Sequence, residues 1–307
     1  MPTAGDDVHF HQVIEDLTDV TIDPSSHFHG TSSLPTQVYV LKSSTSESHV
    51  LSAVTTIRQT ISTINDSDME ITFCINHGVI PYLISLLESS NAELCYESAW
   101  VLTNFASTSN PAHTHSLVNA GVLEALFKCM VTTTHTNIKD QCCRALGNIA
   151  GENAQCAGLF LTPDYMKAIA YSVQCFMELD ACDELSNATW LMMNIFRWKL
   201  FDDLDMYASL IEVCIKILSM MAKLMEGGFH SLLESLLWIF AFLGDIFEQS
   251  YPRYITKELT IYIGALIHDS NPTIRNVALT FIGNVFSDCC PFITEMVEVL
   301  DLITPPV

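Results

Sequence analysis

The chain has 307 residues, of which 49% are hydrophobic and only 16% are charged. Its 35 acidic and 13 basic residues give a formal net charge of -22, without the basic stripe that nucleic-acid-binding proteins use to replace phosphate counterions. The composition therefore argues against nucleic acid as a ligand and favours a neutral or cationic partner, because an anionic field attracts cations. The length allows either two ordinary domains or one elongated array.

Residues 1–48 differ in composition from the rest of the chain. They are rich in Ser, Thr, Asp and His, contain seven acidic residues and a single base, Lys42, and show little periodicity. We expect an acidic, mostly disordered N-terminal tail, because such a segment cannot bury enough apolar surface to fold. Two His-Phe-His pairs, at residues 9–11 and 27–29, lack a third well-spaced ligand, so we expect no metal site and no cofactor.

The sequence predicts neither a membrane protein nor an enzyme. The most apolar stretch, Leu236–Gly244, has nine residues, whereas a spanning helix needs about 20. The 11 cysteines form no Cys-x-x-Cys pair and no secretion signal is visible, which indicates reduced thiols in the cytoplasm or nucleus. No nucleophile elbow, phosphate-binding glycine loop or zinc-protease motif is present, so we expect no catalytic activity.

From residue 49 to residue 307 the pattern is helical. Apolar residues recur at three- and four-residue spacing, beginning with Val50, Val54 and Ile57. Residues 76–87 and 119–130 each combine a glycine turn with an apolar helix, and each is followed by a longer helical segment. One such unit cannot bury its apolar faces alone, so we expect neighbouring units to stack.

The longer segments align with one another around a recurring Asn. They read Glu97-Ser-Ala-Trp-Val-Leu-Thr-Asn104, Gln141-Cys-Cys-Arg-Ala-Leu-Gly-Asn148, Asn187-Ala-Thr-Trp-Leu-Met-Met-Asn194, Ser235-Leu-Leu-Trp-Ile-Phe-Ala-Phe242 and Val277-Ala-Leu-Thr-Phe-Ile-Gly-Asn284. Successive Asn or equivalent positions lie 44, 46, 48 and 42 residues apart, close to the ~40–47 residues of armadillo and HEAT units. The sequence therefore predicts an all-α, right-handed superhelical solenoid of about six armadillo repeats over residues 49–307.

The first three of these segments, the second of them continued by Ile-Ala-Gly-Glu152, resemble the third helices of repeats two, three and four of the importin-α family. Residues 278–285 resemble repeat six. The resemblance covers roughly residues 49–300 and is strongest over residues 70–200. It implies an adaptor that binds basic nuclear localisation signal peptides in a concave Trp/Asn groove, for protein import into the nucleus. It also implies a location in both cytoplasm and nucleus.

The recurring Trp and Asn suit such a groove physically. Spaced four residues apart, they share one helix face. The amide can bond a peptide's C=O and N–H groups, and Trp rings attract the cationic end of a lysine. By the resemblance, the peptide-binding residues are Trp100, Asn104, Asn148, Glu152, Trp190, Asn194, Trp238, Asp245 and Asn284. From the residues alone, the tryptophans can equally be core residues, and the asparagines a buried ladder of hydrogen bonds between repeats.

The sequence departs from the family pattern at several positions. Arg144 stands where the ladder needs Trp and puts a fixed cation beside a lysine slot, and Phe242 replaces an Asn. The basic segment that recruits importin-β has no counterpart in the acidic tail, so docking on importin-β by the usual route is not expected. The array is also expected to lack the family's later repeats.

These departures keep two other interpretations open. The chain can be a degenerate armadillo scaffold or competitor that binds another protein without import activity. It can also be a structural repeat protein that associates with itself through an apolar outer surface, which the low content of charged residues favours.

Overall fold

The computed structural model of this chain describes residues 34–63, 67–200, 202–220, 224, 227–246, 250 and 253–287. Two compact units are distinguished, Met1–Ser33 and Leu34–Val307, and all the described residues belong to the second. The two His-Phe-His pairs of the predicted tail therefore lie outside the described part of the chain.

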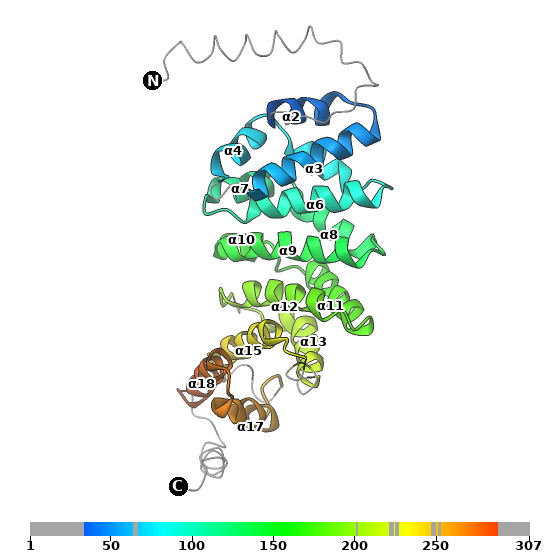
Figure 1. Cartoon of the computed structure of the whole chain (residues 1–307). Coiled ribbons are helices and arrows are strands. Elements are labelled where there is room, and N and C mark those ends of the chain that lie inside the picture. Colours follow the sequence, from blue (N-terminus) through cyan, green and yellow to red (C-terminus); the bar gives the residue numbers. More distant parts are fainter. Residues whose placement is uncertain are drawn as a thin grey trace, which may run out of the picture. The chain divides into compact units, whose positions relative to one another are not determined.

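The Asn-centred segments each lie in one helix, and these helices stack in chain order after α3 (Figure 1). Figure 1 shows α6, α9 and α12 as successive rungs. The rungs are α3 Glu47–Thr63, α6 Ala92–Ala106, α9 Thr136–Glu152, α12 Cys182–Phe196, α15 His230–Gly244 and α18 Pro272–Ser287. The described residues form helices and turns without any strand, which confirms the predicted all-α solenoid.

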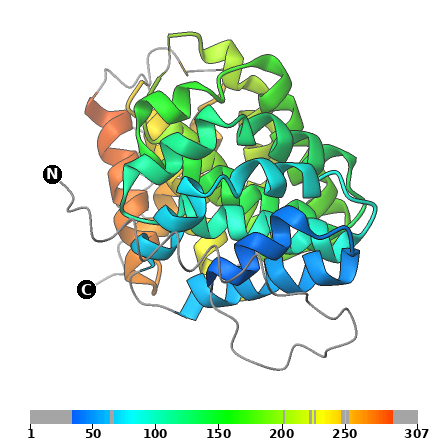
Figure 2. The same ribbon diagram turned by 90° about the horizontal axis from the view of Figure 1, so that it is seen from above.

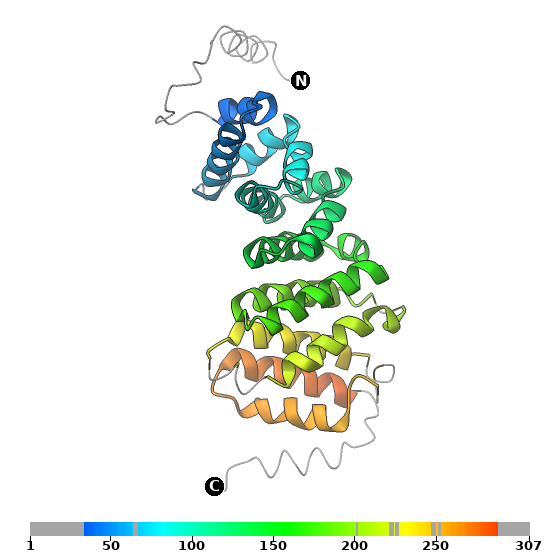
Figure 3. The ribbon, with the colours of Figure 1, turned by 90° about the vertical axis from the view of Figure 1, so that its right-hand side faces the viewer.

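The rungs are connected by a second set of helices, which accompany them in the side view of Figure 3. These are α2 Leu34–Ser43, α4 Asp68–Asn76, α5 Ile80–Leu86, α7 Pro111–Asn119, α8 Val122–Thr132, α10 Ala154–Gly158, α11 Pro163–Glu178, η1 Leu204–Tyr207, α13 Ala208–Leu218, α17 Lys257–Ala265 and η2 Leu266–His268. Among the described residues, no single helix is long and apolar enough to span a membrane. The pair α4 and α5 has that length and composition only when taken together across an 84° bend.

Glycine turns join the short helix to the apolar helix in the early units, as the sequence predicts. Gly78 lies between α4 and α5 with φ 69°, and Gly121 lies between α7 and α8 with φ 82°. Both angles fall in the left-handed region, which glycine adopts without the steric penalty of a Cβ atom. Each turn redirects the chain so that α5 packs against α6 and α8 packs against α9.

Side-chain caps fix where several helices begin. Asn91 accepts hydrogen bonds from the backbone N–H groups of Glu93 and Leu94 at 3.0 and 3.3 Å, and Asn110 accepts one from Ala112 at 3.1 Å. These caps satisfy N–H groups that have no partner inside the helix, and each contributes about 1 kcal/mol. The cap at Asn91 marks the start of α6.

One continuous apolar core runs through the stack of helices. Figure 2 shows this stack of helices from above. Leu102 of α6, Leu146 of α9, Leu191 of α12 and Phe240 of α15 have no exposed surface and belong to the same cluster of buried residues. Because adjacent units share this core, each rung depends on its neighbours for burial.

The structured unit begins earlier than the boundary that the sequence predicts at residue 49. α2 packs against α3 and buries Gln37, Val38 and Leu41. Only two of the buried residues are apolar, so the periodic signal of this helix is weak. A ten-residue helix is marginal by itself, and the stability of α2 comes from its contact with α3.

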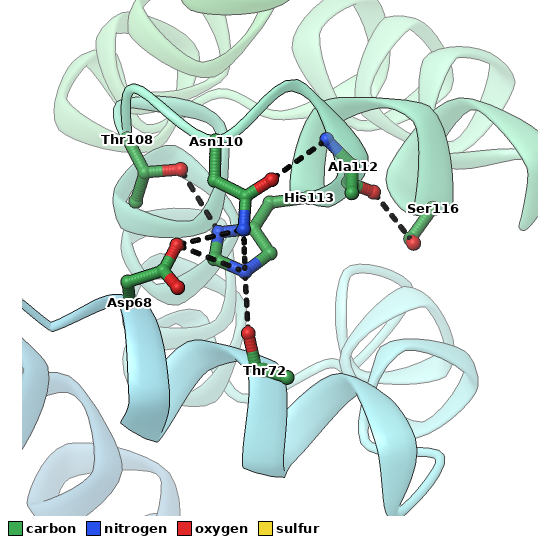
Figure 4. A network of polar contacts seen from close by, with 7 residues as sticks. All are labelled: Asp68, Thr72, Thr108, Asn110, Ala112, His113 and Ser116. Carbon is green, nitrogen blue, oxygen red and sulfur yellow. Dashed lines mark hydrogen bonds and ion pairs between the residues drawn. The ribbon is translucent and has the colours of Figure 1, made fainter. Parts of the chain in front are cut away.

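A buried histidine links the short helices α4 and α7 (Figure 4). The ring of His113 is 2% exposed. Its Nε2 lies 2.8 Å from Thr72 Oγ1 and 3.6 Å from Asp68 Oδ1, and its Nδ1 lies 2.9 Å from Thr108 Oγ1. Asn110, which caps α7, donates to Asp68 at 2.8 Å. Burial lowers the pKa of His113 below its usual value of 6.5, and the nearby carboxylate of Asp68 opposes this shift only in part.

The lowered pKa of His113 predicts a loss of stability in weak acid. As the pH falls through about 6.5, the unfolded chain takes up the proton before the folded one does, so the free energy of unfolding decreases. Above that pH both states are neutral at this ring and nothing is lost. We expect His113→Gln to reduce the drop in urea midpoint between about pH 7.5 and about pH 5.5. An equal drop in the variant and the wild type would contradict this assignment.

Candidate functional site

A groove crosses the rungs α6, α9 and α12, reaches the first turns of α15, and has a volume of ≈ 490 Å³. Four of the predicted peptide-binding residues line it, namely Trp100, Asn104, Asn148 and Trp190. Among the described residues that line it, Arg144 is the only charged one. The four predicted residues come from three successive repeats, and their contact with a peptide remains a prediction.

The sequence pattern did not predict the remaining lining residues, most of which carry a hydroxyl group. They are Thr103, Ser107, Ser186, Asn187, Ser231 and Ser235. A positional signal was available, because Ser186 lies one helical turn before Trp190, and Ser107 lies one turn after Asn104. One further turn of the Trp/Asn face includes Ser186 and Ser107, whereas Ser231 lies two turns before Trp238.

The asparagines connect each rung to the one before it. Asn148 donates through Nδ2 to the carbonyl oxygen of Thr103 at 3.2 Å, and Asn194 donates to that of Gly147 at 3.0 Å. Each acceptor directly precedes the equivalent Asn of the preceding repeat. The buried-ladder interpretation thus accounts for one N–H of each amide. Oδ1 of Asn148 accepts no hydrogen bond from the described residues and is available in the groove.

Asn104 and Asn194 differ from Asn148 in their surroundings. Asn104 donates to Ser62 Oγ at 2.9 Å rather than to a backbone carbonyl. Asn194 is only 2% exposed and its Oδ1 accepts from Arg197 at 3.4 Å. Asn194 does not line the groove, so its contact with a peptide stays a prediction.

The ladder is interrupted at α15 and resumes at α18. Phe242 occupies the Asn position of α15, and its ring stacks on Trp238 with the ring centroids 5.6 Å apart. Both rings are partly buried against the core, and Trp238 lies outside the groove lining. Asn284 then donates to the carbonyl oxygen of Ala241 at 2.9 Å, in the same geometry as the earlier rungs.

Two glycines allow α12 to lie close to α9. A Cβ atom on Gly147 would lie 2.4 Å from Cζ3 of Trp190, and one on Gly151 would lie 3.2 Å from Nδ2 of Asn194. The first separation is shorter than any real contact, so only glycine at position 147 accommodates the ring. The glycines of α9 thus hold Trp190 in its place in the groove.

The face of Trp100 is already occupied by a cation of the same chain. The guanidinium carbon of Arg58, from α3, lies 4.2 Å from the ring centroid. Arg58 Nε donates to Glu97 at 2.5 Å, and the two side chains are 15% and 9% exposed. This burial shields the pair from salt. The cation–π position on this side of Trp100 is therefore filled internally.

Arg144 is exposed and lies on the rung between Trp100 and Trp190. It forms no ion pair with the described residues. One turn earlier on α9, Asp140 accepts a hydrogen bond from Asn187 at 2.8 Å. Burial raises the pKa of Asp140 to about 6, against the opposing effects of Asn187 and Arg144. The groove thus has the fixed cation that the sequence predicts.

The two acids among the predicted peptide-binding residues, Glu152 and Asp245, are paired inside the chain. Glu152 accepts a hydrogen bond from Thr114 Oγ1 at 3.3 Å, and Asp245 accepts one from Lys199 Nζ at 2.5 Å. Neither acid lines the groove. Their contacts with a peptide remain predictions, as does that of Asn284.

The chain is similar to known armadillo repeats and to importin α subunits. Armadillo/beta-catenin-like repeats are matched at residues 67–107 and 110–151. The probable importin subunit alpha-A of Dictyostelium discoideum is 24% identical over 221 residues, which is 69% of this chain and 39% of that protein. Importin subunit alpha-1b of Oryza sativa subsp. japonica is 25% identical over 253 residues, 82% of this chain and 45% of that protein. The chain spans less than half the length of these relatives.

Solved structures with a similar fold include designed armadillo repeat proteins. One of them has a TM-score of 0.65 and is 19% identical, over 82% of this chain and 100% of the designed protein. Another, solved in complex with the peptide (KR)4, has a TM-score of 0.63 and 22% identity, over 83% of this chain and 100% of that one. At these identities the likeness shows the fold.

The stacked units have the fold of armadillo-repeat solenoids, and two of the units match the armadillo repeat model. The chain is similar to importin α subunits at 24–25% identity, over part of their length.

The close approach of α12 to α9 predicts that Gly147→Ala destabilises the protein. Its Cβ would overlap Trp190, and relieving such overpacking typically costs about 1–3 kcal/mol of unfolding free energy. Urea denaturation, followed by tryptophan fluorescence, measures both the loss of stability and any displacement of the ring.

Gly283→Ala is the matched control. Gly283 lies within α18, and a Cβ atom there would meet nothing within 4 Å. Alanine is the better helix former by about 1 kcal/mol, so this variant should be as stable as the wild type or more so. Equal effects of the two substitutions would contradict the steric argument.

Proposed function

We propose that this chain is an importin-α-like adaptor that holds an extended segment of a partner protein in the groove of α6, α9 and α12. Its role is in protein import, in the cytoplasm and nucleus, and it acts by binding rather than by catalysis. The relationship to importin α subunits supports this role.

The observation that carries the proposal is the arrangement of Trp100, Asn148 and Trp190 on three successive rungs. The two half-buried rings provide apolar walls for side-chain stems. Oδ1 of Asn148 offers an acceptor to a backbone N–H between them. An extended peptide needs such a row of backbone partners, because its C=O and N–H groups form no hydrogen bonds with one another.

Basic nuclear signals are the ligand class that the resemblance implies. The net charge of -22 attracts such peptides from a distance, and the ring of Trp190 is available to a lysine stem. Two arginines oppose them at short range. Arg58 occupies one face of Trp100, and Arg144 repels a lysine on the next rung. We therefore expect Lys-rich signals to bind weakly.

The same two arginines support a second candidate function. An armadillo scaffold or competitor would use the groove for a partner segment other than a basic signal. In that case the groove keeps its rings and amides but selects a different side chain at its centre.

The test is a fluorescence-anisotropy titration of a labelled Lys-rich nuclear signal peptide at low and moderate salt. We expect weak binding by the wild type, at least about tenfold weaker binding by Trp190→Ala, and tighter binding by Arg144→Trp. Binding that persists in Trp190→Ala would contradict the groove as the site. Binding only by Arg144→Trp would favour the second candidate.

Tyr262→Ala is the control for loss of an exposed aromatic ring. Tyr262 lies on α17, is 43% exposed and does not line the groove. Its substitution should leave the anisotropy titration unchanged.

A further inference from the structure

Within the described part of the chain, Arg144 differs from the other arginines in making no hydrogen bond and no ion pair. Among the described residues, the other four each donate hydrogen bonds: Arg58 to Glu97, Arg197 to Asn194, Arg253 to Asp205 and Arg275 to the carbonyls of Asp269 and Ser270. Arg144 makes no hydrogen bond or ion pair with the described residues. Its guanidinium is exposed in a groove with hydroxyl and amide walls. A planar cation with five free donors in such a place matches a carboxylate.

Among the described residues, no acid forms an ion pair with Arg144, and no carboxylate lines the groove. Asp140, one turn earlier on α9, is half-buried and accepts a hydrogen bond from Asn187 at 2.8 Å. Its charge interacts with that of Arg144, which lowers the pKa of Asp140 against the larger effect of burial. The centre of the groove is therefore locally cationic, in a chain whose total charge is -22.

The features that would favour a lysine instead are already used within the chain. Arg58 fills the cation position on Trp100. Lys199 neutralises Asp245, and Thr114 bonds Glu152. An incoming lysine would meet a like charge at Arg144 without a free carboxylate to compensate for it, which is unfavourable for binding.

We infer that the groove selects an extended peptide with an Asp or Glu side chain opposite Arg144, between the rings of Trp100 and Trp190. This inference rests on the proposed function, since it names the ligand class of the same groove. The carboxylate receives a two-point hydrogen bond from the guanidinium, and the amide of Asn148 fixes the adjacent backbone. The acidic side chain thereby takes the place that the resemblance assigns to a lysine.

The net negative charge of the chain does not prevent this selection. At physiological ionic strength, charges more than about 8 Å apart are largely screened. The distant acids therefore slow the approach of an acidic peptide at low salt, while Arg144 decides which side chain is retained. We expect binding of the selected peptides to tolerate added salt better than binding of a Lys-rich peptide does.

The experiment uses a displayed library of randomised ten-residue peptides, selected at physiological salt on the full chain. Three proteins are compared: wild type, Arg144→Glu and Lys216→Gln. Lys216 is the control for loss of a positive charge, because it is exposed on α13 and lies outside the groove lining. Selected peptides are then synthesised and titrated against the wild type, Arg144→Gln and Trp190→Ala. Circular dichroism melting checks that each variant is folded.

We expect the wild type and Lys216→Gln to enrich peptides with a central Asp or Glu, and Arg144→Glu to enrich Lys or Arg there instead. Arg144→Gln should weaken the wild-type peptides about tenfold, the effect of removing one charge-assisted pair. Peptides that bind the groove without a preference for acids, and without response at Arg144, would overturn this inference and leave the proposed function intact. Failure to select any peptide that depends on Trp190 would overturn the proposed function itself.

Discussion

The close approach of α12 to α9 is the constraint on which the rest of the groove depends. Gly147 and Gly151 lie one turn apart on α9, and α12 places Trp190 and Asn194 directly against them. Without a Cβ at these positions, the two rungs can approach until the ring of Trp190 covers the backbone. The same approach brings the amide of Asn194 to the carbonyl of Gly147, at 3.0 Å. The packing of α12 against α9 therefore also determines where the ring of Trp190 lies in the groove.

The asparagine ladder has two roles that compete for the same side chains. One N–H of Asn148 is used to join α9 to α6, so only the remaining donor and the carbonyl oxygen are available to a ligand. On α15, Phe242 stands at the Asn position and its ring stacks on that of Trp238. Neither ring lines the groove. A side chain that builds the solenoid is therefore only partly free to bind, and at α15 the groove is lined by Ser231 and Ser235 rather than by the aromatic pair.

Electrostatics separate the centre of the groove from the chain as a whole. The buried pair of Arg58 and Glu97 turns Trp100 from a possible lysine site into part of the structure. Arg144 remains unpaired one rung further on. A total charge of -22 describes attraction at long range, but contacts within a few ångströms decide which side chain stays bound. The net charge that acts at long range is negative, whereas the charged side chain at the centre of the groove, Arg144, is positive.

The solenoid and the central groove residues could be predicted from the sequence, because the spacing of apolar, Trp and Asn residues is local and recurs in each unit. The sequence did not reveal α2, whose short apolar pattern is too sparse, or the hydroxyl residues such as Ser186 and Ser235 that line the groove. Only the tertiary structure decided which predicted residues remain available to a ligand. Arg58 meets Glu97, Glu152 meets Thr114 and Lys199 meets Asp245 across 39, 38 and 46 residues of chain. Such contacts depend on how each rung is rotated relative to the next one. This rotation cannot be predicted from the repeating pattern within one helix.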